Sequence, residues 1–177
     1  MARIPEVSAR EELPEADRHI WDEISASRGQ VQGPFKVLLH SPEFAQRAAH
    51  LGAYVRFESG DHLPPRIREL AVLSTARMLD CGYEYSAHHQ MASKVGISEE
   101  EVAAITARQP AGLGEDRWVY DFAEQVIVRH RVADDVFDAA QTRLGLRGVV
   151  ELTASIGYYC LLAAALNTFG VEPTEPA

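Results

Sequence analysis

Cysteine is scarce in this chain, whose 177 residues include only Cys81 and Cys160. Two cysteines cannot build the disulfide framework of a small secreted domain or the four-cysteine site of a structural zinc ion. Positive charge is also scarce, because 17 Lys and Arg stand against 26 Asp and Glu and give a net charge of −9. Proteins that bind nucleic acid by neutralising phosphates need the opposite balance. We therefore expect no nucleic-acid partner, and a reducing cytoplasm is the simplest location.

Long uninterrupted apolar runs are missing as well. The N-terminal residues lack the apolar stretch of roughly 7 to 15 residues that a signal peptide requires. The longest apolar tract covers residues 149–169, and Glu151, Thr153, Ser155 and Asn167 interrupt it. Basic residues flank this tract on one side only, which is atypical of a membrane span. We therefore expect no membrane partner and a buried core helix over these residues.

Motifs for nucleotides and for serine hydrolases are absent too. The chain has no phosphate-cradling glycine loop, no dinucleotide fingerprint and no G-x-S-x-G turn, so no cofactor is expected. His89 adjoins His88, but adjacent helix residues point about 100° apart. Two ligands from one helix normally lie three or four residues apart, and only Glu84 and His88 meet this condition. The sequence therefore predicts no metal site.

The pattern along the chain predicts an all-α fold. No segment alternates apolar and polar residues over the length of a strand. Ser41-Pro42 and the Ser98–Glu101 capping box are helix starts, while Gly29 and Gly96 are helix stops. About seven or eight helices are expected, over residues 14–28, 42–58, 67–79, 83–95, 98–107, 118–126, 136–144 and 149–169. Residues 109–114 are expected to form a long loop.

One compact unit is expected from the length, since domains contain roughly 100 to 200 residues. Residues 1–40 form an N-terminal helical extension in this interpretation. Residues 41–171 form the main helical domain, and residues 172–177 form a frayed tail. Tyr158 and Tyr159 fall on a helical stripe, where aromatic residues usually belong to the core or to a subunit interface.

The candidate catalytic residues lie between Arg68 and His89. On a helix, positions 81, 84, 85, 88, 91, 92 and 95 share one face, and its later members are apolar. That face should point inward and carry Glu84 and His88 toward the interior or a cleft. Their spacing places them within reach of each other. Such a pair can hold a proton near neutral pH if burial raises the carboxyl pKa, as general acid–base catalysis requires.

Glu69 lies on the preceding predicted helix among apolar residues, so its carboxylate needs a partner in the interior. His88 and Cys81 are both candidates for this partner. Alternatively, Glu69 forms only a salt bridge to Arg66 or Arg77. If a buried His contacted Cys81, it could draw off the thiol proton and make a nucleophilic thiolate. Otherwise Cys81 is a small buried residue at a helix joint.

These residues together resemble a known superfamily. Glu69, Cys81 and His88 are spaced like the Glu and Cys-x-x-Cys-x-x-x-His signature of the carboxymuconolactone decarboxylase and alkylhydroperoxidase AhpD-like proteins. The resemblance implies an AhpD-like helical bundle and a site made of Glu69, Cys81, Glu84 and His88. It also implies a homo-oligomer, a trimer or a hexamer, acting on a small-molecule substrate.

The chain departs from the peroxidase pattern at one position. Glu84 stands where the second cysteine would be, so no dithiol can close between positions 81 and 84. Decarboxylase-like members carry a Glu four residues before the His, as Glu84 precedes His88. The leading hypothesis is therefore cofactor-independent acid–base chemistry, either decarboxylation, isomerisation or elimination, on a small carbonyl, lactone or carboxylate compound. The alternatives are a thiol-dependent peroxidase that uses Cys81 and a non-catalytic helical assembly domain.

Overall fold

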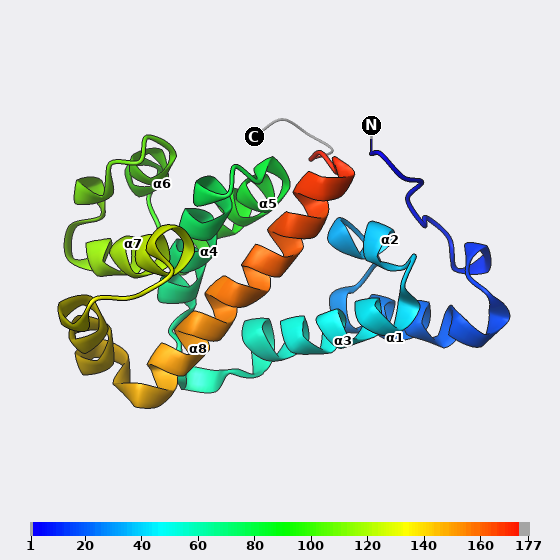
Figure 1. Ribbon diagram of the computed structural model, residues 1–177, viewed down its shortest axis with the longest axis horizontal. Helices are drawn as coiled ribbons and strands as arrows, with labels where there is room; N and C mark the ends of the chain where they lie inside the picture. The colour runs from blue at the N-terminus through cyan, green and yellow to red at the C-terminus, as the bar shows by residue number, and fades with distance from the viewer. Residues whose placement is uncertain (1, 174–177) are drawn as a thin grey trace.

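The computed structural model describes residues 2–173 and contains eight α-helices and no β-strand within that range (Figure 1). The all-α prediction is confirmed, and so is the number of helices. The helices are α1 (Arg18–Arg28), α2 (Pro34–Leu38), α3 (Pro42–Ala53), α4 (Pro65–Met78), α5 (Gly82–Ala92), α6 (Glu99–Thr106), α7 (Arg117–Glu124) and α8 (Asp134–Phe169). Short 3₁₀ turns cover Arg10–Glu12, Glu15–Asp17, Gly60–His62, Ser93–Val95 and Pro110–Asp116, and π-helical segments cover Tyr54–Glu58 and Gln125–Arg129.

Helix α4 lies at the centre of the fold and contacts α5, α7 and α8. All residues from Glu69 to Ala76 are buried, as expected for a helix that is surrounded by others. The hydroxyls of Ser74 and Thr75 each donate to the carbonyl oxygen four residues earlier, at 2.7 Å. These bonds satisfy the polar atoms locally. Glu69 is the charged member of this buried run, so its carboxylate must find a partner on another helix.

Helix α8 crosses the whole molecule and bends at Gly145, where the backbone leaves the helical region with φ of 68° and ψ of 171°. The two helices predicted on either side of this glycine are thus joined into one bent element. By length and composition α8 could cross a membrane, yet 56% of its most apolar window is buried inside the fold. Figure 1 shows it running diagonally between two groups of helices. The apolar tract therefore serves as the core helix of this bundle.

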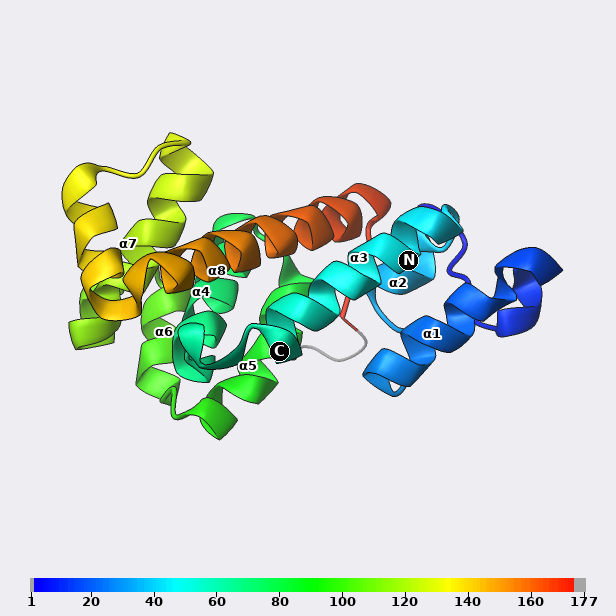
Figure 2. The same ribbon diagram turned by 90° about the horizontal axis from the view of Figure 1, so that it is seen from below.

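The two groups of helices meet at the C-terminal half of α8. Helices α4 to α7 form one apolar cluster with the middle of α8. Helices α1, α2 and α3 form a second cluster with Tyr158, Tyr159 and Leu162 of α8 (Figures 1 and 2). Val72 of α4 also belongs to this second cluster. The two tyrosines consequently lie at the junction of both groups, which is where the candidate site forms.

Three local features differ from the sequence-based expectation. Residues 110–116 are wound into 3₁₀ turns instead of an open loop, with a break at Gly114, where φ is 54°. Helix α2 was not predicted, because five residues are too few to show helical periodicity. The end of the predicted helix over 42–58 is a π-helical segment, Tyr54–Glu58. Of the predicted frayed tail, residues 174–177 lie outside the described part of the chain.

Candidate active site

Glu69 and His88 form a buried hydrogen-bonded pair between α4 and α5. The Oε2 atom of Glu69 lies 2.5 Å from Nδ1 of His88, and both side chains are at most 10% exposed. An ionised carboxylate can only accept hydrogen bonds, so we assign the proton of this contact to Nδ1, which donates to Glu69. In a neutral imidazole this leaves Nε2 as the free basic atom. Arg66 and Arg77, the alternative partners of Glu69, instead pair with Glu101 and Asp116 and with Asp80.

Glu84 approaches His88 from the other side of the imidazole ring. Its Oε2 atom lies 3.6 Å from Nε2 of His88, which is too long for a hydrogen bond but close enough for a strong ionic interaction. Glu84 is 5% exposed, and this burial raises the pKa of its carboxyl. The positive charges of His88, Arg56 and Arg28 oppose this rise to a smaller extent. His88 therefore lies between two carboxyl groups, and burial favours the protonated form of Glu84.

The His88 ring is also fixed by an aromatic neighbour. Tyr159 of α8 meets it edge-on, with ring centroids 4.9 Å apart and an angle of 90° between the planes. Tyr159 is itself 2% exposed, and burial raises the pKa of its phenol, so the hydroxyl keeps its proton. Packing and hydrogen bonding together hold the imidazole in one orientation, as an acid–base group requires.

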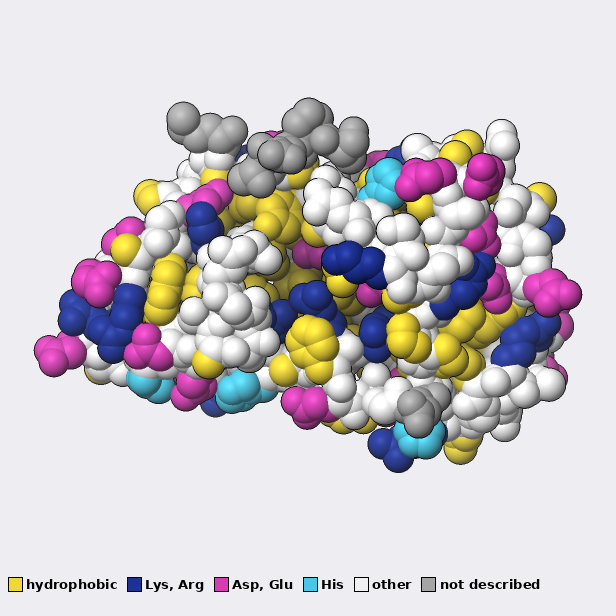
Figure 3. All heavy atoms as spheres, turned by 180° about the vertical axis from the view of Figure 1, so that it is seen from behind, with side chains coloured by type: hydrophobic (Ala, Val, Ile, Leu, Met, Phe, Trp, Pro, Cys, Tyr) yellow, Lys and Arg dark blue, Asp and Glu magenta, His cyan; other side chains and the backbone are white. Residues whose placement is uncertain are grey.

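A cavity of about 490 Å³ opens beside Glu84 and His88. This volume lies within the range of roughly 300–1,000 Å³ that is usual for small-molecule sites. Residues of α1, α2, the π-helical segment 54–58, α5 and α8 line it, among them Arg28, Phe35, Arg56, Phe57, Tyr158 and Tyr159. Figure 3 shows a hollow in one face of the molecule with Lys and Arg side chains at its edge. Glu69 does not line the cavity and lies behind the imidazole.

Cys81 stands apart from this cluster. It is 1% exposed and packs against Val37, Ala163 and Leu166, outside the residues that line the cavity. Burial raises the pKa of its thiol to about 11, although the backbone N–H groups of Glu84 and Tyr83 partly oppose this rise. The structure thus brings together three of the four predicted site residues and places the fourth in an apolar cluster. The contact between Cys81 and His88 that the sequence left open is not formed, because both ring nitrogens face carboxylates.

Sequence reasoning missed the two arginines of the cavity, Arg28 and Arg56. They come from the end of α1 and from the π-helical segment, and no local motif links them to the later Glu84 and His88. Tyr158 and Tyr159 were expected in the core or at a subunit interface. Both are indeed buried, but they also line the cavity.

The polar cluster is not arranged around a common point where a cation would lie. Glu69 and Glu84 face opposite nitrogens of the His88 ring, so the three side chains do not converge. Within residues 2–173 no group of three or more His, Cys, Asp or Glu side chains has the geometry to hold a metal ion.

Solved structures show that this arrangement of helices is an AhpD-like fold. An AhpD-core, peroxidase-related protein from Ralstonia eutropha JMP134 matches with a TM-score of 0.78 at 22% identity, over 98% of this chain and 93% of its own. A protein of unknown function from Agrobacterium tumefaciens, a candidate AhpD of antioxidant defence, matches with a TM-score of 0.64 at 19% identity, over 81% and 100%. The debrominase Bmp8 matches with a TM-score of 0.69 at 12% identity, over 97% and 90%.

The middle of the chain matches a known family model. Residues 42–124 match the model of the Carboxymuconolactone decarboxylase family. This segment runs from α3 to α7 and contains Glu69, Cys81, Glu84 and His88. Over this segment the chain is similar to that family, and the AhpD-like fold of the solved structures agrees with it, so both comparisons support the resemblance drawn from the sequence. None of the curated proteins matches the chain.

Proposed function

We propose that this protein is a cofactor-independent enzyme that transfers protons to and from carbon in a small carbonyl, lactone or carboxylate compound. The observation that carries the proposal is the position of His88, held between Glu69 and Glu84 and facing a cavity of about 490 Å³. A non-catalytic assembly domain would need no such cavity beside its buried charges. Decarboxylation, isomerisation and elimination all require this proton chemistry next to a carbonyl group.

Each member of the cluster has its own role in this proposal. Glu69 accepts the hydrogen bond from Nδ1–H and is a positioning residue, because it does not reach the cavity. His88 uses Nε2 to take a proton from the substrate carbon. Glu84, whose pKa is raised by burial, supplies a proton to the substrate oxygen or returns one to carbon. In isomerisation and elimination the two steps leave the enzyme with the same number of protons that it had at the start. In decarboxylation the C–C bond breaks and CO₂ leaves, Glu84 gives its proton to the carbon, and solvent restores that proton.

Hydrogen exchange at carbon tests the proposal with simple probe compounds in place of the natural substrate. The protein is incubated in D₂O with levulinate, oxaloacetate, α-angelica lactone and cyclopentanone, and deuterium incorporation is followed by NMR. We expect exchange on at least one probe, and we expect His88→Asn and Glu84→Gln to lower its rate about 100-fold or more. Circular dichroism checks that both variants are folded. Full exchange rates in both folded variants would overturn the proposal.

Thiol chemistry at Cys81 is the second candidate, and the AhpD-like fold of the neighbours favours it. A cysteine-to-alanine variant of the debrominase Bmp8 has been solved in complex with 2,3,4-tribromopyrrole. The raised pKa of Cys81 and its place away from the cavity support proton chemistry instead. Treatment with a low dose of peroxide followed by mass spectrometry separates the two: a sulfenic acid or mixed disulfide at Cys81 would favour the thiol candidate.

We also propose that the chain forms a homo-oligomer in the cytoplasm. Phe44 and Leu51 of α3 lie two helical turns apart and are 44% and 45% exposed, and Phe57 is 62% exposed. Exposed apolar side chains that gather on one element are typical of a subunit interface. Light scattering after size exclusion would contradict this proposal if it gave the mass of a single chain at micromolar concentration.

A further inference from the structure

Two arginines line the same cavity as Glu84, namely Arg28 and Arg56. Among the side chains that the structure describes, which do not include that of Asp61, no carboxylate oxygen lies within 4.0 Å of either guanidinium. The guanidinium of Arg28 lies 4.3 Å from the centre of the Phe35 ring and donates through Nη2 to the carbonyl of Ala49. That of Arg56 lies 5.1 Å from the centre of the Phe57 ring. Aromatic rings and a carbonyl orient the two cations, and the one carboxyl group that lines the cavity with them, Glu84, lies beyond ion-pair distance of both.

Within the described part of the chain, two buried polar atoms of the same wall have no hydrogen-bond partner at standard distance, namely Nε of Arg28 and the hydroxyl of Tyr158, and the Arg28 side chain lies beside that hydroxyl. Tyr158 is 2% exposed, and an unsatisfied buried donor of this kind carries a free-energy penalty. The backbone makes room for both groups at Gly52. A Cβ atom there would overlap the Tyr158 hydroxyl and would lie 2.6 Å from Nη2 of Arg28. The fold thus keeps two unsatisfied polar groups on the side of the cavity formed by α1 and α8.

The π-helical segment is what places the second arginine. Tyr54–Glu58 follows α3 directly, and its wider turn changes which residues of the chain face α5 and α8. Arg56 and Phe57 of this segment both line the cavity. Inserted turns of this kind occur frequently at functional sites.

The charged side chains that line the cavity favour binding of an anion. Arg28 and Arg56 carry two positive charges, and Glu84 carries at most one negative charge. Burial raises the pKa of Glu84, which favours its uncharged form. The wall therefore keeps a positive excess of at least one charge, even though the whole chain has a net charge of −9. Guanidinium groups recognise carboxylates through paired hydrogen bonds. Phe35, Phe57 and Leu162 add apolar surface for the remainder of a small molecule.

We propose that Arg28, Arg56 and the Tyr158 hydroxyl form a subsite for the carboxylate of a small organic acid in the cavity that His88 also lines. This inference rests on the proposed function, because it says which group of the substrate is held while His88 exchanges protons on a neighbouring carbon. It narrows the substrate from carbonyl compounds in general to those that carry a carboxylate and an apolar body.

Binding of matched acids and amides tests the subsite without any turnover. Benzoate and levulinate are titrated into the protein by isothermal calorimetry, with benzamide and levulinamide as neutral partners of similar shape. We expect the acids to bind more tightly than their amides. We expect Arg56→Met to weaken binding of the acids about tenfold or more and to leave binding of the amides unchanged. Arg28→Met is a second variant and should act in the same direction.

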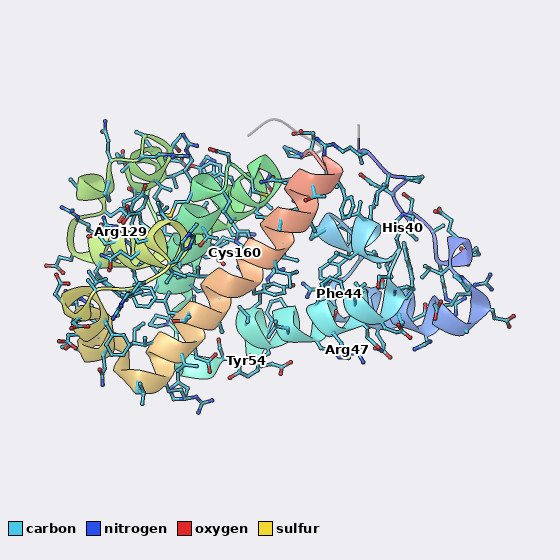
Figure 4. All side chains as sticks on the ribbon, viewed as in Figure 1. His40, Phe44, Arg47, Tyr54, Arg129 and Cys160 are labelled. Carbon is cyan, nitrogen blue, oxygen red and sulfur yellow. The ribbon has the colours of Figure 1, made fainter. Side chains whose placement is uncertain are left out.

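Arg47→Met is the matched control, because Arg47 lies exposed on α3 and contacts only the carbonyl oxygen of Glu43 (Figure 4). It should bind the acids as the unchanged protein does. The inference is overturned if no carboxylate probe binds, if acids and amides bind equally, or if both cavity variants retain full affinity. Levulinate, unlike benzoate, has exchangeable hydrogens beside a ketone. If it binds through the two arginines but shows no exchange dependent on His88, the result would support the subsite and overturn the proposed function.

Discussion

The inner and outer faces of α5 each carry a histidine paired with a glutamate, in opposite surroundings. His88 on the inner face is 5% exposed and meets Glu69 at 2.5 Å. Its neighbour in sequence, His89, has a side chain that is 31% exposed and meets Glu99 at 3.1 Å, where Glu99 is 77% exposed. The same two residue types thus form a buried pair next to a cavity and a surface pair next to solvent.

The two pairs differ in whether water can solvate a side chain that has lost its partner. At the surface, water and salt stabilise each charge separately, and an exposed ion pair contributes about 0–1 kcal/mol. In the interior, a group that loses its partner remains desolvated, and the loss is large. The buried pair therefore has a defined geometry that chemistry can use, while the surface pair has only a weak effect on helix α5.

The largest expected effect comes from removing the inner carboxylate. Glu69→Ala leaves the Nδ1–H group of His88 buried without an acceptor and should lower the free energy of unfolding by about 3–5 kcal/mol. Urea denaturation followed by circular dichroism measures this change. Glu99→Ala is the matched change at the surface and should alter it by less than about 1 kcal/mol. Equal losses in the two variants would mean that the buried pair contributes no more to stability than the surface pair.

Cys81 provides the next test, because it precedes the inner face of α5. Its thiol pKa of about 11, against an ordinary value of 9.0, leaves about 100-fold less thiolate near neutral pH. We therefore expect Cys81 in the folded protein to react with iodoacetamide at least about 100-fold more slowly than in urea. Peptide mass spectrometry follows the reaction at each cysteine. Fast labelling of Cys81 under native conditions would show a thiol that is exposed or activated.

The pH dependence of the free energy of unfolding tests the burial of Glu84 on the inner face of α5. Its folded-state pKa is raised, so above about pH 4.5 the unfolded chain loses this proton while the folded protein keeps it. Stability should fall as pH rises through this window, with a slope of at most about 1.4 kcal/mol per pH unit from this group. Glu84→Gln should remove that contribution and raise stability at neutral pH. If the profiles of the two proteins run parallel, the carboxyl is not shifted.

The smallest effect is expected on the outer face. His89→Ala removes an exposed ring that pairs with Glu99 and tilts against Tyr85 at a centroid distance of 6.2 Å. It should change the free energy of unfolding by less than about 1 kcal/mol. A thermal melt compares it with the unchanged protein, and a loss as large as that of Glu69→Ala would mean that the outer face is also structural.

The sequence was informative where the chemistry depends on regular helix geometry. The spacing of Glu84 and His88, followed by Met91 and Ala92, predicted an inward polar pair, and both side chains are buried. The apolar neighbours of Glu69 predicted a buried carboxylate that needs a partner. The all-α fold followed from periodicity and from caps such as Ser98 with Glu101, whose capping box is formed.

The same reasoning failed where the backbone leaves the regular helix. Cys81 precedes the first residue of α5 and has an extended backbone, with ψ of 92°, so the face of the helix does not extend to it. Arg56 lies on a π-helical turn that residue spacing does not reveal. Tyr159 contacts His88 only because α8 folds back over α5 from 71 positions later in the sequence, and no local pattern encodes such a contact.

The central claim is that proton transfer in this protein depends on the inner histidine and not on the outer one. The most direct measurement is therefore the rate of deuterium incorporation into the carbon probes by His88→Asn and His89→Asn, each checked for folding. The account predicts that His88→Asn lowers the rate about 100-fold or more and that His89→Asn leaves it within about twofold. Equal rates in the two folded variants would contradict it.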